Sequence, residues 1–378
     1  MTAYAYPLLI KQLLLTPLAN APEQEIVYRD LHRYDYRALR DRIGRLGGGL
    51  GSRLGVLPGQ TVAVMDWDSH RYLECFFAIP MLGAVLQTVN VRLSPEQIVY
   101  TLNHARADVL LVHEDFLPLL ESFRAQLETV RRFVLLSDAP SPDCPPQFDT
   151  DYETLLAGGD PEHVFPDFDE NTRATTFYTT GTTGHPKGVY FSHRQLVLHT
   201  LAAAAAFGTA PVQGSFGRRD VYMPITPMFH VHAWGFPYIA TMLGVKQVYP
   251  GRYQPDVLLR LIRQEGVTFS HCVPTLLHML LSAAQTASAT LHGWKVVIGG
   301  SALPKGLAQA ALELGADVYA GYGLSETCPI LSLGLLEPGE ADAADVALSR
   351  RVRAGRAIPL VDIRVAGEAG NEMPHDGL

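Results

Sequence analysis

A run of small residues that ends in a lysine is the part of this sequence best suited to chemistry. Residues 178–189 read YTTGTTGHPKGV, so that two glycines and four threonines precede Lys187. Glycine lets the backbone turn tightly and approach a ligand closely. Successive backbone N–H groups in such a turn form a concavity for an anion, threonine hydroxyls add donors, and lysine adds a point charge. The pattern predicts a phosphate-binding loop and indicates a nucleotide ligand.

This loop differs from the phosphate loop of kinases and GTPases, GxxxxGK[ST], which leads from a strand into a helix. Pro186 stands where that motif has its second glycine, and Gly188 replaces its Ser or Thr. Residues 175–179 and 189–191 are typical of strands, and a helix is expected only after Ser192. The alternative is a surface hairpin rich in Gly and Thr. The chain has 5 lysines beside 25 arginines, so a lysine here favours a need for a compact charge.

Two further segments with unusual residues follow consecutive predicted strands. The strand at 296–298 runs into GGSALP at 299–304, and the strand at 318–320 runs into GYGLSET at 321–327. Ligands of open α/β sheets bind beyond the C-terminal ends of the strands, so both segments should meet at one edge. Glu326 brings a carboxylate there, and Mg²⁺ is typically held by one or two carboxylates plus phosphate oxygens. A tight turn at the glycines and a solvated loop acid are the alternatives.

A fourth segment combines histidines with aromatic residues after a strand end. Residues 224–235 read PITPMFHVHAWG. His230 and His232 have no cysteine or carboxylate at metal-ligand spacing, so a zinc site is not expected. An imidazole among aromatic rings suits contact with a substrate carboxylate, and Trp234 suits the wall of an apolar tunnel. The alternative is that these residues belong to the core.

The composition is that of a soluble globular protein with a substantial core: of 378 residues, 47% are hydrophobic and 18% charged. The net charge of -8 gives no general attraction to nucleic acid or anionic membranes. No apolar run reaches the ~18 residues of a membrane span, and the N-terminus lacks the layout of a signal peptide. Cys75, Cys144, Cys272 and Cys328 are far apart, so we expect free thiols in a reducing cytoplasm. Cys328 lies near other candidate residues and could be a nucleophile, but no obvious base lies near it in the sequence.

Strands and helices alternate along the chain, which predicts an α/β fold with helix-covered, mostly parallel sheets. Ser94 and Ser192 each precede a Gln three residues later, a capping box that marks a helix start. Segment 138–169 is rich in Pro, Asp and Gly and indicates a connector, and 361–365 alternates as in a small antiparallel or barrel-like piece. The expected strands are 61–65, 109–113, 130–137, 221–225, 246–249, 268–273, 295–298 and 317–320, and the expected helices are 69–82, 94–105, one containing 202–206, 233–243, 256–264, 274–284 and 304–314.

With these segments in order, the sequence resembles the adenylate-forming ligases, the superfamily of acyl-CoA synthetases, firefly-type luciferases and peptide-synthetase adenylation domains. The family's phosphate loop resembles T[SGT]GTTGxPKG, which residues 179–188 match throughout. Its adenine and magnesium motif resembles YGx[ST]E, which 322–326 match, and its GGxx[LM] element is matched by 299–303. Segment 228–234 looks most like medium- and long-chain fatty acyl-CoA synthetases. His230 stands where amino-acid-activating members usually have an Asp, which argues against an amino-acid substrate.

The resemblance covers essentially the whole chain, and it implies a fold and a reaction. The fold would be the large domain of an acyl-CoA synthetase, with a first α/β subdomain at 1–165, a second at 166–335 that holds the nucleotide site, and the start of a β-barrel at 336–378. A carboxylate would attack the α-phosphorus of MgATP, giving acyl-AMP and pyrophosphate, and the thiol of coenzyme A would then displace AMP. ATP or AMP, Mg²⁺, coenzyme A and a small carboxylic acid are the implied ligands. No nucleic acid is expected as a partner, and an oligomer is left open.

The resemblance also implies roles for single residues, with Lys187, His230 and Glu326 as the catalytic set. The β and γ phosphates would lie on the loop, Ser325 would contact the α-phosphate, and Glu326 with Thr179 would hold Mg²⁺. His230 would contact the acyl carboxylate at the mouth of an acyl tunnel. The loop residues are Thr179, Thr180, Gly181, Thr182, Thr183, Gly184 and Lys187; the adenine residues are Gly299, Gly300, Ser301, Gly321, Tyr322 and Gly323; the acyl residues are His230, Val231, Trp234 and Gly235.

One departure from the family concerns length. Family members usually continue well beyond this point, into a mobile small domain that carries a catalytic lysine. We therefore expect a truncated large domain that binds nucleotide weakly and catalyses adenylation poorly or not at all. An aryl- or amino-acid-activating member and a non-catalytic binding module are the alternatives that the sequence leaves open. The acyl chain length is also open, because the small residues 202–206 and Gly235 suit either an acyl tail or tight helix packing.

Overall fold

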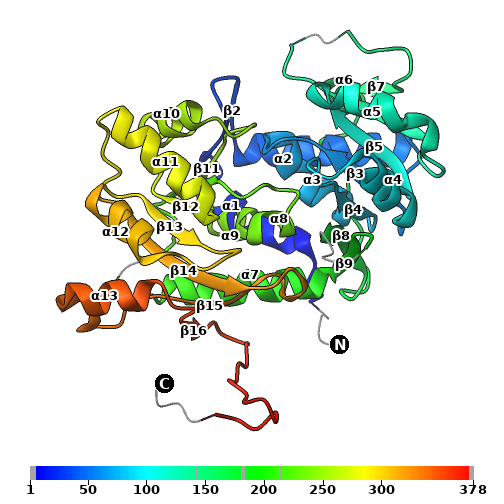
Figure 1. Cartoon of the computed structure of the whole chain (residues 1–378). Helices are drawn as coiled ribbons and strands as arrows, with labels where there is room; N and C mark the ends of the chain where they lie inside the picture. The colour runs from blue at the N-terminus through cyan, green and yellow to red at the C-terminus, as the bar shows by residue number, and fades with distance from the viewer. Residues whose placement is uncertain (1–5, 141–142, 180–183, 213, 374–378) are drawn as a thin grey trace.

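The structure is a computed structural model, and it describes residues 6–140, 143–179, 184–212 and 214–373. Two sheets form its framework, and helices cover them (Figure 1). Most neighbouring strands are parallel, which confirms the fold class predicted from the alternation of strands and helices.

The first sheet has seven strands. All neighbours in it are parallel except the last two, which form an antiparallel pair around the predicted phosphate loop. In spatial order the strands are β7 (Thr150–Asp151), β6 (Arg132–Leu136), β5 (Ala107–His113), β3 (Thr61–Met65), β4 (Val85–Thr88), β8 (Arg173–Thr179) and β9 (Lys187–Ser192).

The second sheet has nine strands. Its middle, from β14 to β1, is parallel, and the pairs at its two edges are antiparallel. In spatial order the strands are β16 (Arg356–Ala357), β15 (Ile330–Leu333), β14 (Asp317–Gly323), β13 (Lys295–Ile298), β12 (Phe269–Cys272), β10 (Val221–Pro224), β11 (Lys246–Tyr249), β1 (Glu25–Tyr28) and β2 (His32–Asp35).

Several helices begin at a polar residue whose side chain accepts a hydrogen bond from the first turn. Both capping boxes form as predicted, Ser94 with Gln97 and Ser192 with Gln195. The helices are α1 (Leu15–Asn20), α2 (Tyr36–Gly48), α3 (His70–Met81), α4 (Pro95–His104), α5 (Leu117–Phe123), α6 (Tyr152–Ala157), α7 (His193–Gly208), α8 (Val231–Trp234), α9 (Phe236–Leu243), α10 (Pro255–Glu265), α11 (Pro274–Thr286), α12 (Lys305–Glu313) and α13 (Ala344–Arg351).

Helix α3 holds the two sheets together. Every one of its residues is buried, and it packs against β3, β4 and β8 of the first sheet and β1 of the second (Figure 1). The charged residues of this buried helix are paired, Arg71 with Asp138 and Glu74 with Arg42, both at 2.7 Å. Helices α10 to α12 cover the outer face of the second sheet, and α4 and α5 that of the first. Within the described residues, no helix is both long and apolar enough to cross a membrane.

Each of the two sheets contains strands from both sides of residue 165. Strands β1 and β2 come from the first part of the chain but belong to the second sheet, and β8 and β9 come from the second part but belong to the first sheet. The proposed subdomain boundaries stay a prediction. Segment 138–169 is more than a connector, because β7 and α6 form within it.

Two local expectations were wrong. The segment at 321–323 was expected to be a loop, but β14 continues through it because the later strand β15 pairs with it antiparallel. Residues 361–365 form no strand, and the only pairing near them is an isolated bridge between Ala366 and Glu372. Val361 packs at the edge of the core, whereas Ile363 and Val365 are exposed, at 41% and 65%.

Candidate functional site

All four segments that the sequence singles out have residues at one cavity of about 430 Å³, which we call the central cavity. They meet because β13 and β14 are parallel and in register, with Ile298 opposite Ala320, so that both glycine segments emerge at the same edge. The segment after β10 and the end of β8 complete the wall. Ten of the predicted site residues line it: Thr179, His230, Val231, Trp234, Gly299, Gly300, Gly321, Gly323, Ser325 and Glu326.

The glycines of this wall are required by close packing. A Cβ on Gly299 would lie 2.8 Å from the Trp234 ring and 3.1 Å from the backbone oxygen of Gly321. A Cβ on Gly323 would lie 1.9 Å from the backbone oxygen of Pro329. These glycines therefore bring the Trp234 ring and the backbone together at the floor of the cavity, which is the role that glycine serves at ligand sites.

The segment that carries His230 and Trp234 is held in an unusual conformation. A helix was predicted over 233–243, but residues 231–234 are left-handed, with φ between 46° and 58°, and the right-handed helix α9 starts only after Gly235. Left-handed non-glycine residues cost about 1–2 kcal/mol each. Two hydrogen bonds hold the segment's start: Thr88 Oγ1 donates to Phe229 O at 2.9 Å, and Met228 N donates to Asp68 Oδ1 at 2.8 Å. Such strain is concentrated at functional sites.

The two histidines of this segment have different surroundings. His230 is exposed to the central cavity, yet the protein around it and then the charge of Arg92 lower its pKa, so that it is neutral at pH 7. His232 points into the core, where Phe76 and Phe177 meet it edge to face and burial lowers its pKa to about 3. The structure thus separates the candidate ligand contact from the core histidine.

Glu326 is available for a ligand. It lies in a short 3-10 turn, Ser325–Thr327, directly after β14, with its side chain exposed at the cavity. Among the described residues, no hydrogen bond or ion pair engages its carboxylate, and Thr327 Oγ1 fixes the turn by donating to Pro329 O at 2.6 Å. Nowhere in the described residues do three or more His, Cys, Asp or Glu side chains form a group that could hold a metal ion. A single free carboxylate beside a polyphosphate fits Mg²⁺, which binds protein through one or two carboxylates.

The phosphate loop is only partly described. Thr179 ends β8 and lines the cavity, and Lys187 begins β9 directly opposite it. The predicted residues Thr180, Gly181, Thr182 and Thr183 lie outside the described residues. The predicted residues that do not line the central cavity are Gly184, Lys187, Gly235, Ser301 and Tyr322.

Further residues of the wall were not predicted. Asn90 follows the end of β4, so the rule that ligands bind beyond strand ends would have found it had that strand been predicted. Ile330 is fixed by its N–H, which donates to His199 Nε2 at 3.2 Å. Cys328 is buried and its pKa is raised by burial, which argues against a nucleophile. The other lining residues are Tyr178, Val297, Leu324, Pro329 and Leu333.

Comparison with known proteins gives the same assignment as the motifs. The family model of the AMP-binding enzymes matches residues 16–377. The long-chain-fatty-acid–CoA ligase of Thermus thermophilus is 42% identical, over 94% of this chain and 64% of the relative. The 3-methylmercaptopropionyl-CoA ligase of Ruegeria lacuscaerulensis is 36% identical, over 98% of this chain and 70% of the relative. The chain thus spans about two thirds of the length of these curated relatives.

A solved structure has the same fold. The anthranilate CoA ligase AuaEII, in complex with anthranoyl-AMP, superposes with a TM-score of 0.81 at 22% identity and covers 99% of this chain and 68% of its own. At this identity the likeness concerns the fold alone. The family match over nearly the whole chain and the 42% identical relative confirm the resemblance drawn from the motifs. The chain belongs to the AMP-binding enzyme family.

Proposed function

We propose that this protein activates a carboxylic acid with ATP, forming acyl-AMP in the central cavity for transfer to coenzyme A. The observation that carries the proposal is the meeting, in one cavity of about 430 Å³, of a glycine floor, a free carboxylate and a neutral imidazole. Small-molecule sites are concave, of ~300–1,000 Å³, with a few placed polar groups. The family supports the same reaction class.

The glycine floor suits the adenosine. Gly299, Gly300, Gly321 and Gly323 present backbone without side chains at the edge of the sheet, so a flat ring can lie against it. Ser325, in the turn after β14, is half-buried in the cavity wall and would reach the α-phosphate. The nucleotide would thus lie along the ends of β13 and β14.

The polyphosphate would lie between Thr179 and Glu326, with Lys187 at the start of the neighbouring strand. Glu326 and Thr179 would hold Mg²⁺, which when bound neutralises charge on the leaving pyrophosphate. The loop N–H groups and Lys187 would add donors aimed at the same oxygens. Pre-arranged donors of this kind are usually the largest catalytic contribution in such transfers.

The acid would bind on the side of His230. Because the pKa of His230 is lowered, its imidazole is neutral at pH 7 and can donate a hydrogen bond to the carboxylate without forming a tight ion pair. Val231 and Trp234 give this side an apolar surface. A fatty acid is the substrate that we propose, and the Thermus thermophilus relative, named for long-chain fatty acids, supports it.

A comparison of acyl-adenylate analogues tests the substrate class. We would titrate the 378-residue chain with sulfamoyl adenosines that carry dodecanoyl, benzoyl or phenylalanyl groups and measure affinities by calorimetry. The dodecanoyl analogue should bind at least about tenfold more tightly than the others, because its tail buries more apolar surface. A preference for the benzoyl or phenylalanyl analogue would replace the fatty-acyl assignment with an aryl- or amino-acid-activating one.

The reaction itself needs a separate assay. ATP–pyrophosphate exchange that depends on added fatty acid reports the adenylation step, and acyl-CoA formation reports the second step. We expect exchange only when fatty acid is added, and acyl-CoA formation only when coenzyme A is added as well, because each step needs its own acceptor. Tight analogue binding with no exchange at any enzyme concentration would favour the non-catalytic binding module.

A further inference from the structure

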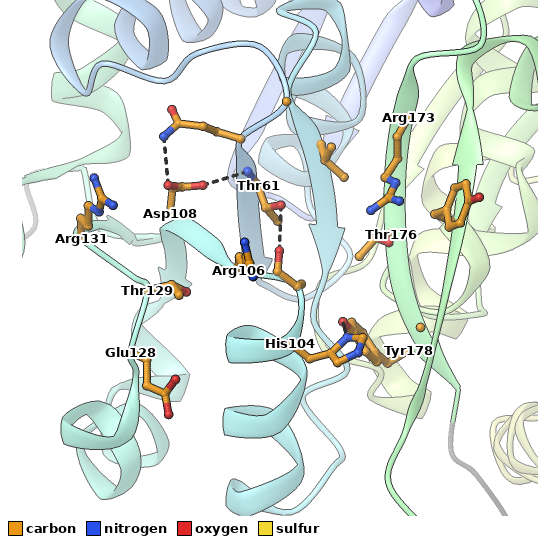
Figure 2. A pocket seen from close by; sticks show the side chains of 16 residues that line it. Thr61, His104, Arg106, Asp108, Glu128, Thr129, Arg131, Arg173, Thr176 and Tyr178 are labelled. Carbon is orange, nitrogen blue, oxygen red and sulfur yellow. Dashed lines mark hydrogen bonds between the residues drawn. The ribbon is translucent and has the colours of Figure 1, made fainter.

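A second cavity, of about 840 Å³, lies on the first sheet and has no role in the reaction above. It forms where β3, β5 and β6 begin, whereas the central cavity forms where strands end. Figure 2 shows Arg173, Thr176 and Tyr178 of β8 on one side and Arg106 and Asp108, at the start of β5, on the other. We call it the arginine cavity.

Three arginines line this cavity without a carboxylate partner among the described residues: Arg106, Arg131 and Arg173. Arginines elsewhere in this protein are commonly paired. Arg132, the direct neighbour of Arg131, forms an ion pair with Asp149 at 2.7 Å. The three unpaired guanidinium groups come from three different strand starts, so the fold and not the local sequence collects them.

The acidic residues of the cavity do not cancel this charge. The carboxylate of Asp108 accepts hydrogen bonds from Gln60 Nε2 at 2.9 Å and from Thr61 N at 3.1 Å, so it is already engaged at the start of β3. Glu128 is the other acid in the wall. Three guanidinium groups against two carboxylates leave a local positive charge in a chain whose net charge is -8. Guanidinium groups bind phosphate oxygens in a two-pronged geometry, which favours a phosphorylated ligand.

Arg106 occupies a position that favours glycine. It follows the last turn of α4 with φ 52°, the left-handed conformation in which glycine usually ends a helix. A non-glycine residue there costs about 1–2 kcal/mol. A charge at the C-terminal end of a helix recovers only part of this, about 0.3–1 kcal/mol. An arginine kept under strain at a cavity indicates a role for its side chain.

An exposed aromatic ring completes the wall. Tyr190 on β9 is 57% exposed, and the Arg173 guanidinium stacks over its ring at 4.2 Å. Rings that stack with arginine at a basic surface are typical of contacts with nucleotide bases. The cavity also shares Tyr178 with the central cavity, and the hydroxyl of that residue is hydrogen-bonded to His104 Nδ1 at 2.8 Å. The two cavities are therefore neighbours with a common wall.

We propose that the arginine cavity binds the phosphate groups of a phosphorylated nucleotide, with Arg106, Arg131 and Arg173 as ligands and Tyr190 beside the base. Two sources carry this chemistry, a free nucleotide and the nucleotide end of coenzyme A. Binding of the nucleotide end of coenzyme A would rest on the proposed ligase function, whereas the existence of the phosphate site does not depend on that function.

The test uses adenosine 3′,5′-bisphosphate as the probe, with the central cavity blocked by a saturating acyl-sulfamoyl adenosine. We expect each of Arg106→Gln, Arg131→Gln and Arg173→Gln to weaken binding about tenfold and the triple variant at least about 100-fold. Arg219→Gln, which alters an exposed arginine outside this cavity, is the matched control and should bind as the parent does. Binding by the triple variant within about twofold of the parent, or no saturable binding by the parent, would overturn the proposal.

Competition separates the two sources. Coenzyme A that displaces the probe, with dephospho-coenzyme A much weaker, identifies the nucleotide end of coenzyme A. ATP or AMP that displaces it equally well identifies a free nucleotide. Because the probe carries no acyl group, failure of the ligase assays leaves this result interpretable.

Arg106→Gly gives a second, independent readout. It removes both the guanidinium and the backbone strain, so we expect unchanged or higher thermal stability together with about tenfold weaker probe binding. A less stable variant that binds the probe as the parent does would assign Arg106 to the end of α4 instead, and would remove it from the site.

Discussion

The two cavities of this protein are built in opposite ways, although β8 contributes to both. The central cavity lies at strand ends and is lined by glycines and by turns held at close backbone contacts. The arginine cavity lies at strand starts and is lined by long, exposed, charged side chains. A site made of backbone is rigid and intolerant of substitution, whereas a site made of side chains can change its ligand while the fold is kept.

The largest effect should come from adding a methyl group to the central cavity. Gly323→Ala places a Cβ 1.9 Å from the Pro329 backbone oxygen, so β14 or β15 must shift. We expect a loss of about 3 kcal/mol in the free energy of unfolding, measured by urea denaturation. Gly188→Ala in the arginine cavity is the control, because the atoms nearest to its Cβ belong to a side chain, that of Tyr178, at 3.2 Å. Equal losses in the two variants would remove the distinction between the cavities.

The next effect concerns the free carboxylate. Glu326→Gln keeps the size of the side chain but removes its charge, so Mg²⁺-dependent binding of ATP should weaken by about 30- to 100-fold. AMP binding without Mg²⁺ should change by less than about threefold, since the floor is intact. Calorimetry with and without Mg²⁺ measures both. If AMP binding falls as much as Mg²⁺-dependent ATP binding, Glu326 supports the fold and not the metal.

The packing around the central cavity should also make stability depend on pH. Burial lowers the pKa of His199 and His193 to about 4 and that of His232 and His271 to about 3. The unfolded chain therefore binds protons first, and stability falls as the pH drops from about 6.5 toward about 4. His199→Gln preserves an acceptor for Ile330 N. As the pH falls through this range, the free energy of unfolding of the variant should drop by about 1 kcal/mol less per pH unit than that of the parent. Parallel stability curves for parent and variant would contradict this assignment.

The smallest expected effect is that of salt. Raising the ionic strength from about 50 mM to about 500 mM should weaken the bisphosphate probe about fivefold, because its ligands are exposed guanidinium groups. Binding of a dodecanoyl-sulfamoyl adenosine in the central cavity should change by less than about twofold, because apolar and backbone contacts are not screened. The same salt dependence at both sites would show that charge also governs the central cavity.

Much of the fold and part of the site could be predicted from local patterns. The capping boxes at Ser94 and Ser192 involve residues three positions apart, so the sequence alone fixes where α4 and α7 begin. The glycine segments at 299–304 and 321–327 were predicted to meet because parallel strands bring their ends to one edge. Ten predicted residues do line one cavity, while their roles in catalysis stay proposals.

Other features escaped local reasoning. The helix predicted at 233–243 starts too early, because residues 231–234 form a left-handed turn. The hydrogen bonds that hold the start of this turn come from Thr88 and Asp68, far away in the chain. The continuation of β14 through Gly323 likewise depends on a partner strand that comes later. Asn90 was missed because the short strand before it gives a weak pattern.

By itself, the sequence determined the starts of α4 and α7, the alternation of strands and helices, and the kinds of chemical group near the strand ends. These depend on contacts within a few residues, so their physical cause is local. Only the tertiary structure decided that β1 and β2 join the second sheet, that His232 faces the core while His230 faces a cavity, and that three distant arginines line one cavity. These features depend on packing between segments far apart in the chain, and no local pattern encodes which of them will meet.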